Sequence, residues 1–280
     1  AQLVAAAAQW GNAFLGFGLR RGDRIPFILD DTPAYPAAFF GAVRAGLVPV
    51  LLNTQTNAET LAYFLADTEA RLVLCEADLR GAFPDEIVAA SGVEKIVIVN
   101  GGAEASGQIS DEEFLQGMPT DLDCGDTSTG DMAFWMYSSG TTGRPKGIVH
   151  LHHDMAYTQH SYGRHVLGVR ADDVCLSIPK IYFAYGFGNS LTFPFSVGGT
   201  TVLLPGRPKP AAIFEAINTW RPTIFFGLPT LYTALCNAPE AANNNLSSIR
   251  LSISAAETLS RDIYDSWKAI AGHGPTEGLG

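Results

Sequence analysis

The alternation of short apolar segments with helical segments is the feature that most constrains the fold of this 280-residue chain. Nearly continuous apolar runs predict strands that are buried on both faces, and an apolar repeat of about 3.6 residues predicts the helices that cover them. Strands are expected at 24–29, 48–52, 71–75, 95–99, 132–137, 174–178, 200–204, 223–226 and 249–254. Helices are expected at 1–19, 33–45, 58–66, 111–116, 154–165, 211–220, 229–236 and 260–270. This order is typical of βαβ units, so we predict an α/β protein with parallel-rich sheets flanked by helices.

The alternation is interrupted between residues 100 and 130, where Gly, Ser, Asp and Thr are frequent and only one short helix is expected. Such a stretch is typical of a boundary between compact parts of a chain. We therefore predict a first α/β subdomain at 1–128 and a second at 129–280.

Charge and apolar patterning exclude several classes of partner. The net charge of −10 and the pI near 5.0 argue against a nucleic-acid partner, which would require clustered Lys and Arg. No apolar run is long enough to span a bilayer, and no basic segment precedes the apolar start at 1–8, so we expect a cytoplasmic protein without membrane contact. The four cysteines are widely spaced, which predicts buried, reduced thiols instead of a disulfide framework.

The segment at 137–147 carries the strongest chemical information. It reads YSSGTTGRPKG, follows an apolar strand, and combines three glycines, four Ser or Thr hydroxyls and two cations. Glycines let the backbone approach a bulky anion with its N–H groups turned inward, hydroxyls add donors, and Lys146 adds positive charge. This combination predicts a polyphosphate site, and a simple polar hairpin would need neither the hydroxyls nor the lysine.

Two common phosphate motifs do not fit the sequence. A Walker A loop that starts at Gly140 would place its second glycine at Pro145, and no Ser or Thr follows Lys146. The dinucleotide fingerprint fails at 186–191, because Leu191 occupies the position of its third glycine.

Residues 137–147 resemble the signature loop of the adenylate-forming superfamily, which includes acyl- and aryl-CoA ligases, firefly-type luciferases and peptide-synthetase adenylation domains. We keep the name signature loop for these residues. The resemblance implies the N-terminal large domain of these enzymes, with two parallel-rich β-sheets flanked by helices. It also implies that the loop binds the β- and γ-phosphates of ATP and that Thr141 and Lys146 take part in catalysis. The residues implied to bind ATP here are Ser138, Ser139, Gly140, Thr141, Thr142, Gly143 and Lys146.

Two later blocks agree with this resemblance in order and spacing. Residues 254–259 resemble the superfamily's adenine-binding turn, which implies that Ala255, Ala256 and Glu257 contact the nucleotide. Residues 273–277 resemble the next block, in which Thr276 would contact the α-phosphate and Glu277 would coordinate Mg²⁺, both as catalytic residues. The superfamily normally has an apolar strand and an aromatic residue here, whereas this chain runs from the helix at 260–270 directly into His273.

The segment at 183–186 looks most like that of benzoate–CoA ligases. We therefore expect Ala184, Tyr185 and Gly186 to bind the acid, because an apolar wall with small residues suits a flat aromatic ring. The alternative is that the aromatic residues of this segment pack in the core. The resemblance implies an acid–thiol ligase of the benzoate–CoA ligase type, which uses ATP, Mg²⁺ and coenzyme A to convert an aromatic carboxylic acid into an aryl-adenylate and then a CoA thioester.

Several alternatives stay open. The chain begins without Met and ends directly after the last block, so we expect the family's C-terminal mobile domain to be absent, and the chain could act as a nucleotide- and acid-binding core with little turnover. It could instead load a carrier protein, and a homodimer is also allowed. The cluster of His150, His152, His153 and Asp154 could hold a transition metal, but it is interpreted here as the start of a helix.

Overall fold

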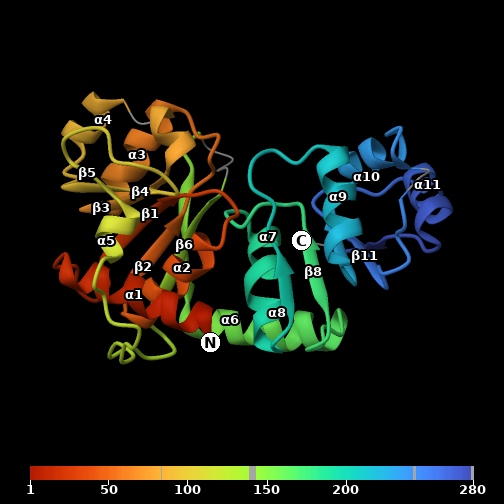
Figure 1. The fold of residues 1–280 in the computed structure, drawn as a ribbon, viewed down its shortest axis with the longest axis horizontal. Coiled ribbons are helices and arrows are strands. Elements are labelled where there is room, and N and C mark those ends of the chain that lie inside the picture. The colour runs from red at the N-terminus through yellow and green to blue at the C-terminus, as the bar shows by residue number, and fades with distance from the viewer. Residues whose placement is uncertain (83, 139–142, 242–243, 279–280) are drawn as a thin grey trace. The chain divides into compact units, whose positions relative to one another are not determined.

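The computed structural model describes residues 1–82, 84–138, 143–241 and 244–278 (Figure 1). Its internal contacts divide the chain into two compact units, Ala1–Asp154 (unit 1) and Met155–Gly280 (unit 2). Each unit contains one largely parallel sheet, which confirms the predicted α/β class. The division at 128/129 that the sequence suggested stays a prediction. In the part of the chain that the structure describes, no helix has the length and apolar character needed to cross a bilayer.

Unit 1 is built on a seven-stranded sheet with the order β5-β4-β3-β1-β2-β6-β7. All neighbouring strands are parallel except β6 and β7, which form an antiparallel pair. The strands are β1 (Arg24–Ile28), β2 (Val48–Leu51), β3 (Leu72–Glu76), β4 (Lys95–Val99), β5 (Gln108–Ser110), β6 (Met132–Ser138) and β7 (Lys146–Leu151). The sequence predicted five of them. It did not predict β5, which has only three residues, or β7, whose first four residues are exposed.

Helices cover both faces of this sheet. They are α1 (Gln2–Gly16), α2 (Ala34–Arg44), α3 (Ala58–Thr68), η1 (Ala77–Ala82), α4 (Asp85–Ala90) and α5 (Asp111–Leu115). Phe64 of α3 belongs to a core cluster with Ile28, Val50 and Val73 of the sheet. Helix α2 lies on the other face, where Phe39 contacts Phe134 edge-on. Strand residues thus contribute to two apolar layers, as expected for a covered sheet. Figure 1 shows the helices on the two faces of this sheet.

Helix α3 has a well-defined start and end. The side chain of Asn57 accepts a hydrogen bond of 2.9 Å from the Thr60 N–H, a normal N-terminal cap. The helix ends where Glu69 adopts φ 49° in the left-handed region. The local sequence therefore sets the bounds of this helix, and its apolar face packs on the sheet.

Unit 2 contains a five-stranded, wholly parallel sheet with the order β12-β11-β10-β8-β9. Its strands are β8 (Val174–Ser177), β9 (Thr200–Val202), β10 (Ile224–Gly227), β11 (Leu251–Ser254) and β12 (Thr276–Glu277). Four of these were predicted. Strand β12 was not, because its two residues carry no apolar pattern. It lies after His273, and no strand lies between the end of α11 at Ala271 and His273, as the sequence indicated.

The helices of unit 2 also lie on both faces of its sheet. They are α6 (His152–Thr158), which crosses the division between the units, η2 (Gln159–Val166), α7 (Ala184–Phe187), η3 (Gly188–Thr192), α8 (Phe193–Ser196), α9 (Pro210–Trp220), α10 (Pro229–Cys236) and α11 (Arg261–Ala271). One core cluster joins α9, α10 and α11 to the sheet through Phe214, Tyr232 and Trp267. A second joins the other face to η2 and α8 through Phe193 and Phe226. The helical stretch 184–196 was not predicted, because its sequence is rich in aromatic residues and glycine.

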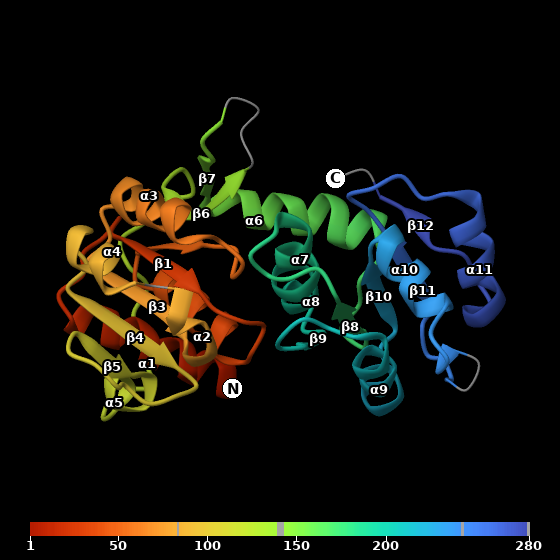
Figure 2. The ribbon, with the colours of Figure 1, turned by 90° about the horizontal axis from the view of Figure 1, so that it is seen from above.

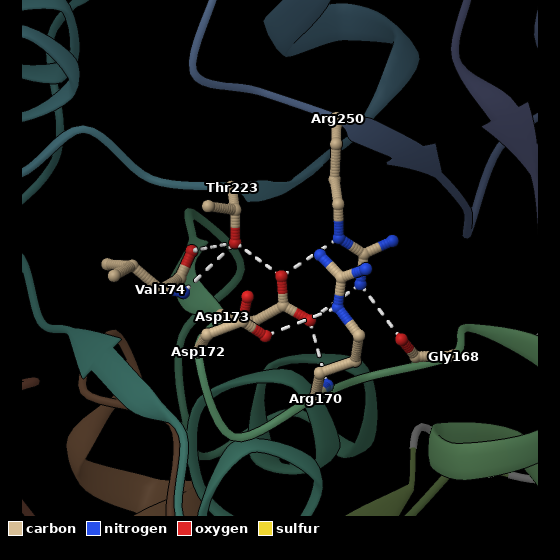
Figure 3. Close-up of polar contacts among 7 residues, drawn as sticks. All are labelled: Gly168, Arg170, Asp172, Asp173, Val174, Thr223 and Arg250. Atoms are coloured by element: carbon tan, nitrogen blue, oxygen red, sulfur yellow. Dashed lines mark hydrogen bonds and ion pairs between the residues drawn. The ribbon is translucent and has the colours of Figure 1, made fainter.

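The two ends of the unit 2 strands differ in character. At the amino ends, Asp173, Thr223 and Arg250 form a hydrogen-bonded network (Figure 3). At the carboxyl ends, β11 finishes at Ser254 and β12 at Glu277. Ligands of parallel α/β sheets bind at the carboxyl ends of the strands, so these ends are where a site is expected.

The cysteine prediction was partly wrong. All four thiols are free, and Cys75 and Cys175 are buried as predicted. Cys124 is exposed and Cys236 is half-buried, because each lies outside the sheet strands that bury the other two.

Candidate functional site

The flanks of the signature loop in unit 1 form an antiparallel hairpin. Ser138, the last residue of β6, is paired with Lys146, the first residue of β7, and Tyr137 is paired with Gly147. Lys146 is exposed, so its ammonium group is open to a ligand. Gly143 adopts φ 113°, a conformation that disfavours residues with a side chain. The predicted ATP-binding residues Ser139, Gly140, Thr141 and Thr142 lie outside the described residues.

Helix α3 contacts both flanks of this hairpin (Figure 2). The Tyr63 hydroxyl donates a hydrogen bond of 3.2 Å to the Pro145 carbonyl oxygen. The Tyr137 hydroxyl donates one of 2.6 Å to Asp67 Oδ2. Burial, together with this bond to Asp67, raises the pKa of Tyr137, so the phenol stays protonated. Sequence reasoning did not single out Tyr63 or Asp67, because 82 and 70 residues separate them from their partners.

In unit 2 the predicted adenine turn lies beside the predicted magnesium-binding block. Thr276 pairs with Ile253 and Glu277 with Ser254 in the parallel sheet. Glu277 Oε1 accepts a hydrogen bond of 2.9 Å from the Leu259 N–H, and the Gly278 N–H donates one of 2.8 Å to the Ser254 carbonyl oxygen. The structure therefore brings together five residues that the sequence placed in two separate blocks: Ala255, Ala256, Glu257, Thr276 and Glu277.

The turn itself has an unusual backbone. Ala256 adopts φ 70°, which is uncommon for a residue other than glycine. Glu257 Oε2 accepts a weak hydrogen bond of 3.4 Å from the Thr230 N–H at the start of α10. Ala255 is buried, whereas Ala256 and Glu257 are exposed. The turn thus presents at Ala256 an exposed residue with a small side chain.

The predicted acid-binding residues form the start of α7. Ala184 is exposed at the first position of the helix. The Tyr185 hydroxyl lies 3.3 Å from the carbonyl oxygens of both Gly227 and Ile253, near the carboxyl ends of β10 and β11. A phenol has one hydrogen, so it donates to one of them at a time. Burial raises the pKa of Tyr185 and keeps it neutral.

Gly186 has a clear steric reason to be glycine. A Cβ at this position would collide with the carbonyl oxygens of Pro179 and Lys180. Of the neighbouring aromatic residues, Tyr182 and Phe187 are buried in the core, whereas Phe183 is exposed. Core packing therefore accounts for Tyr182 and Phe187 but not for Phe183.

Sequence reasoning assigned no role to two buried polar residues of η3. Asn189 and Ser190 are buried, and among the described residues neither amide atom of Asn189 nor the Ser190 hydroxyl has a hydrogen-bond partner. Buried polar side chains are normally paired with protein or water. A Gly-Asn-Ser sequence inside an otherwise apolar stretch was the signal that could have identified them.

The histidine cluster has the contacts of a helix start. The His150 ring stacks on Phe134 at 4.5 Å, and Asp154 accepts a hydrogen bond of 3.0 Å from the Leu151 N–H. Burial lowers the pKa of His152. Across the described ranges, no three His, Cys, Asp or Glu side chains converge in a way that could hold a metal ion.

The family model of the AMP-binding enzymes matches residues 1–280. The chain belongs to the AMP-binding enzyme family. This result confirms the resemblance to adenylate-forming enzymes that rested on the signature loop. Relatives of this chain within the AMP-binding family include ligases of aromatic acids.

Benzoate–CoA ligase of Thauera aromatica is 36% identical, over 94% of this chain and 49% of the relative. The 4-hydroxybenzoate–CoA/benzoate–CoA ligase of Rhodopseudomonas palustris is 35% identical, over 100% of this chain and 51% of the relative. The crystal structure of an anthranilate CoA ligase in complex with anthranoyl-AMP superposes with a TM-score of 0.96 at 32% identity, over 100% of this chain and 54% of the other. The chain therefore spans about half the length of the AMP-binding relatives that it matches.

Proposed function

We propose that the protein activates benzoate or a closely related aromatic carboxylic acid with ATP, forming an aryl-adenylate and then an aryl-CoA thioester. The observation that carries this proposal is the hairpin in which Ser138 faces Lys146 at the base of the signature loop. Family membership and the aromatic-acid ligases among the relatives support it. Benzoate is named in this proposal because residues 183–186 look most like those of benzoate–CoA ligases, and hydroxylated and aminated benzoates belong to the same proposed class of acid.

Lys146 is proposed to bind the β- and γ-phosphates of ATP. Its exposed ammonium group is a compact positive charge, and the neighbouring glycines and hydroxyls supply donors for a bulky anion. Such fixed donors stabilise the negative charge that grows on the leaving pyrophosphate. Ser138 and Gly143 are proposed to share this role with Ser139, Gly140, Thr141 and Thr142.

The adenine turn and β12 are proposed to bind the rest of the nucleotide. The exposed backbone at Ala256 suits the base, and the Thr276 hydroxyl is proposed to contact the α-phosphate. Glu277 offers hard oxygen ligands, of which Oε1 is oriented by the Leu259 N–H, and this donor type fits Mg²⁺. When bound, Mg²⁺ would supply positive charge to the phosphates.

Ala184, Tyr185 and Gly186 are proposed to bind the aromatic ring. Ala184 is small and exposed, and the Tyr185 hydroxyl is held at the ends of β10 and β11. The neutral phenol presents an apolar ring without adding charge near the acid carboxylate.

The proposed reaction depends on positioning and on charge more than on a protein nucleophile. A carboxylate oxygen of the acid attacks the α-phosphorus of ATP, the bond to the β-phosphate oxygen breaks, and pyrophosphate leaves. The CoA thiol then loses its proton and attacks the acyl carbon, and AMP leaves. The products are the thioester, AMP and pyrophosphate.

Benzoate-dependent exchange of pyrophosphate into ATP tests the first step. Lys146→Ala should slow the exchange strongly while the protein remains folded, and Lys209→Ala, at an exposed position before α9, should leave it unchanged. An exchange rate unaffected by Lys146→Ala would refute the role of Lys146.

Three further readouts separate the alternatives. Calorimetric binding of ATP and benzoate without exchange would indicate a binding core. Transfer of the acyl group to a phosphopantetheine-bearing carrier, with no reaction with free CoA, would indicate a carrier-loading enzyme. Product formation with CoA supports the ligase.

A further inference from the structure

We propose that Tyr63 and Asp67 of helix α3 are positioning residues that hold the two flanks of the signature loop, so that Lys146 is placed to bind the phosphates of ATP. This inference rests on the proposed function. It extends the proposed phosphate site to helix α3, which lies outside the signature loop. Neither side chain is proposed to touch the nucleotide.

The first contact fixes the strand that leads into Lys146. The Tyr63 hydroxyl donates a hydrogen bond of 3.2 Å to the carbonyl oxygen of Pro145, which directly precedes Lys146. The guanidinium of Arg144 lies over the Tyr63 ring at 5.5 Å from its centroid, a cation–π distance. One tyrosine of α3 therefore contacts two successive residues immediately before Lys146.

The second contact fixes the opposite flank. Asp67 lies four residues after Tyr63 and therefore on the same face of α3. Its Oδ2 accepts a hydrogen bond of 2.6 Å from the Tyr137 hydroxyl, and the Phe64 ring stacks on Tyr137 at 3.9 Å. Tyr137 is paired across the hairpin with Gly147.

Gly147 shows how closely these groups meet. A Cβ built on Gly147 would lie 3.6 Å from the Tyr137 ring and 3.7 Å from Asp67 Oδ2, which is ordinary packing distance. Pro145, before Lys146, thus contacts Tyr63 of α3. Gly147, after Lys146, lies against Tyr137 and against Asp67 of α3.

The position of β7 in the sheet explains why such support matters. Strand β7 is the last in the order of the described sheet and pairs only with β6, and its residues 146–149 are exposed. An edge strand with exposed residues gains little from core packing. Contacts with α3 therefore add to the pairing with β6 in fixing the backbone position from which the Lys146 side chain extends.

This arrangement predicts a selective effect on the phosphate tail. Tyr63→Phe removes only the hydroxyl that donates to Pro145, and keeps the ring that Arg144 covers. We expect affinity for ATP to fall about three- to tenfold, as for loss of one hydrogen bond, and affinity for AMP to stay unchanged because AMP lacks the β- and γ-phosphates. Asp67→Ala should act similarly, whereas Asp67→Asn keeps an oxygen acceptor for Tyr137 and should restore ATP binding.

The test is calorimetric titration of the protein with ATP and, separately, with AMP, for the wild type and the variants Tyr63→Phe, Asp67→Ala and Asp67→Asn. Tyr157→Phe is the matched control, because it makes the same chemical change at a side chain that is 71% exposed. Thermal unfolding verifies that each variant is folded. If Asp67→Ala does not fold, Tyr63→Phe alone carries the test.

The outcomes separate this inference from the proposed function. A fall in ATP affinity for Tyr63→Phe, with AMP affinity retained, supports the positioning role. Equal changes for ATP and AMP, or no change for either, overturn it. Lys146→Ala is titrated alongside: if that variant binds ATP as well as the wild type does, the phosphate-binding role of the hairpin itself is wrong, whatever the α3 variants show.

Discussion

The Arg250 guanidinium donates two hydrogen bonds to the carboxylate of Asp173, from Nε to Oδ1 at 2.8 Å and from Nη2 to Oδ2 at 2.6 Å (Figure 3). Thr223 adds a third hydrogen bond, of 2.7 Å to Oδ1. Asp173 directly precedes β8, Thr223 precedes β10 and Arg250 precedes β11. The network therefore joins the amino ends of three strands. It lies at the end of the sheet opposite Ser254 and Glu277, which indicates a structural role.

Arg250→Met should destabilise the protein markedly. The Asp173 side chain has no exposed surface, so the variant leaves a buried carboxylate without its cation. We expect the free energy of unfolding in urea to fall by about 3 kcal/mol. This value is at the low end of the range for breaking a buried ion pair, because the Arg250 side chain is 31% exposed. Arg261→Met breaks an exposed pair with Asp265 and should have little effect. Equal losses for the two variants would contradict this account.

The same network makes stability depend on pH in a defined direction. Burial would raise the pKa of Asp173, but hydrogen bonds from Arg250, Thr223 and the Arg170 N–H outweigh it and hold that pKa below its ordinary value. The stabilisation is fully present above the unfolded-state pKa of about 3.9 and is lost as the pH falls through the lower folded-state pKa.

Asp173→Asn isolates this contribution, because the amide cannot ionise. The difference in unfolding free energy between wild type and variant should be constant above about pH 5 and shrink below about pH 4. Urea unfolding across this range measures it. A difference that keeps its full size at the lowest pH at which the protein folds would rule out Asp173 as the titrating group.

Local chemistry explains which features the sequence predicted. The apolar runs of β1 to β4 are contiguous, and the glycines, hydroxyls and lysine of the signature loop are adjacent, so both could be recognised without a structure. Strand β7 was missed because Lys146 to Val149 are exposed and carry no burial pattern. The contacts of Tyr63 and Asp67 could not be predicted, because their partners are distant in sequence and neither residue forms a motif.

Glu277→Gln should change the magnesium requirement of pyrophosphate exchange without disturbing the turn at Leu259. The glutamine oxygen can still accept the Leu259 N–H that Glu277 Oε1 now binds at 2.9 Å, but the negative charge is gone. The Mg²⁺ concentration for half-maximal exchange should therefore rise severalfold. Glu240→Gln, an exposed change before the loop to β11, is the control. An unchanged Mg²⁺ midpoint in Glu277→Gln would show that Glu277 is not a ligand.

Asn189→Leu should not destabilise the protein in the absence of substrates. Both amide atoms of Asn189 are buried without a hydrogen-bond partner among the described residues, so an apolar side chain of similar size should be neutral or should stabilise by about 1 kcal/mol. Ser252→Ala is the contrasting variant, since it removes the acceptor of the Trp267 Nε1–H at 3.0 Å and should cost about 1–3 kcal/mol. A clear loss of stability in Asn189→Leu would contradict this account.

The four thiols should react with a cysteine reagent at neutral pH in an order set by burial. Burial raises the pKa of Cys75 and of Cys175 to about 12, so neither forms the reactive thiolate in the folded protein. Cys124 is exposed and should react first, and Cys236, whose pKa burial also raises, should react more slowly. Peptide mass analysis after timed labelling measures the order. Cys124→Ser should abolish the fast phase, and labelling of Cys75 at the rate of Cys124 in the folded state would show that β3 is not buried as described.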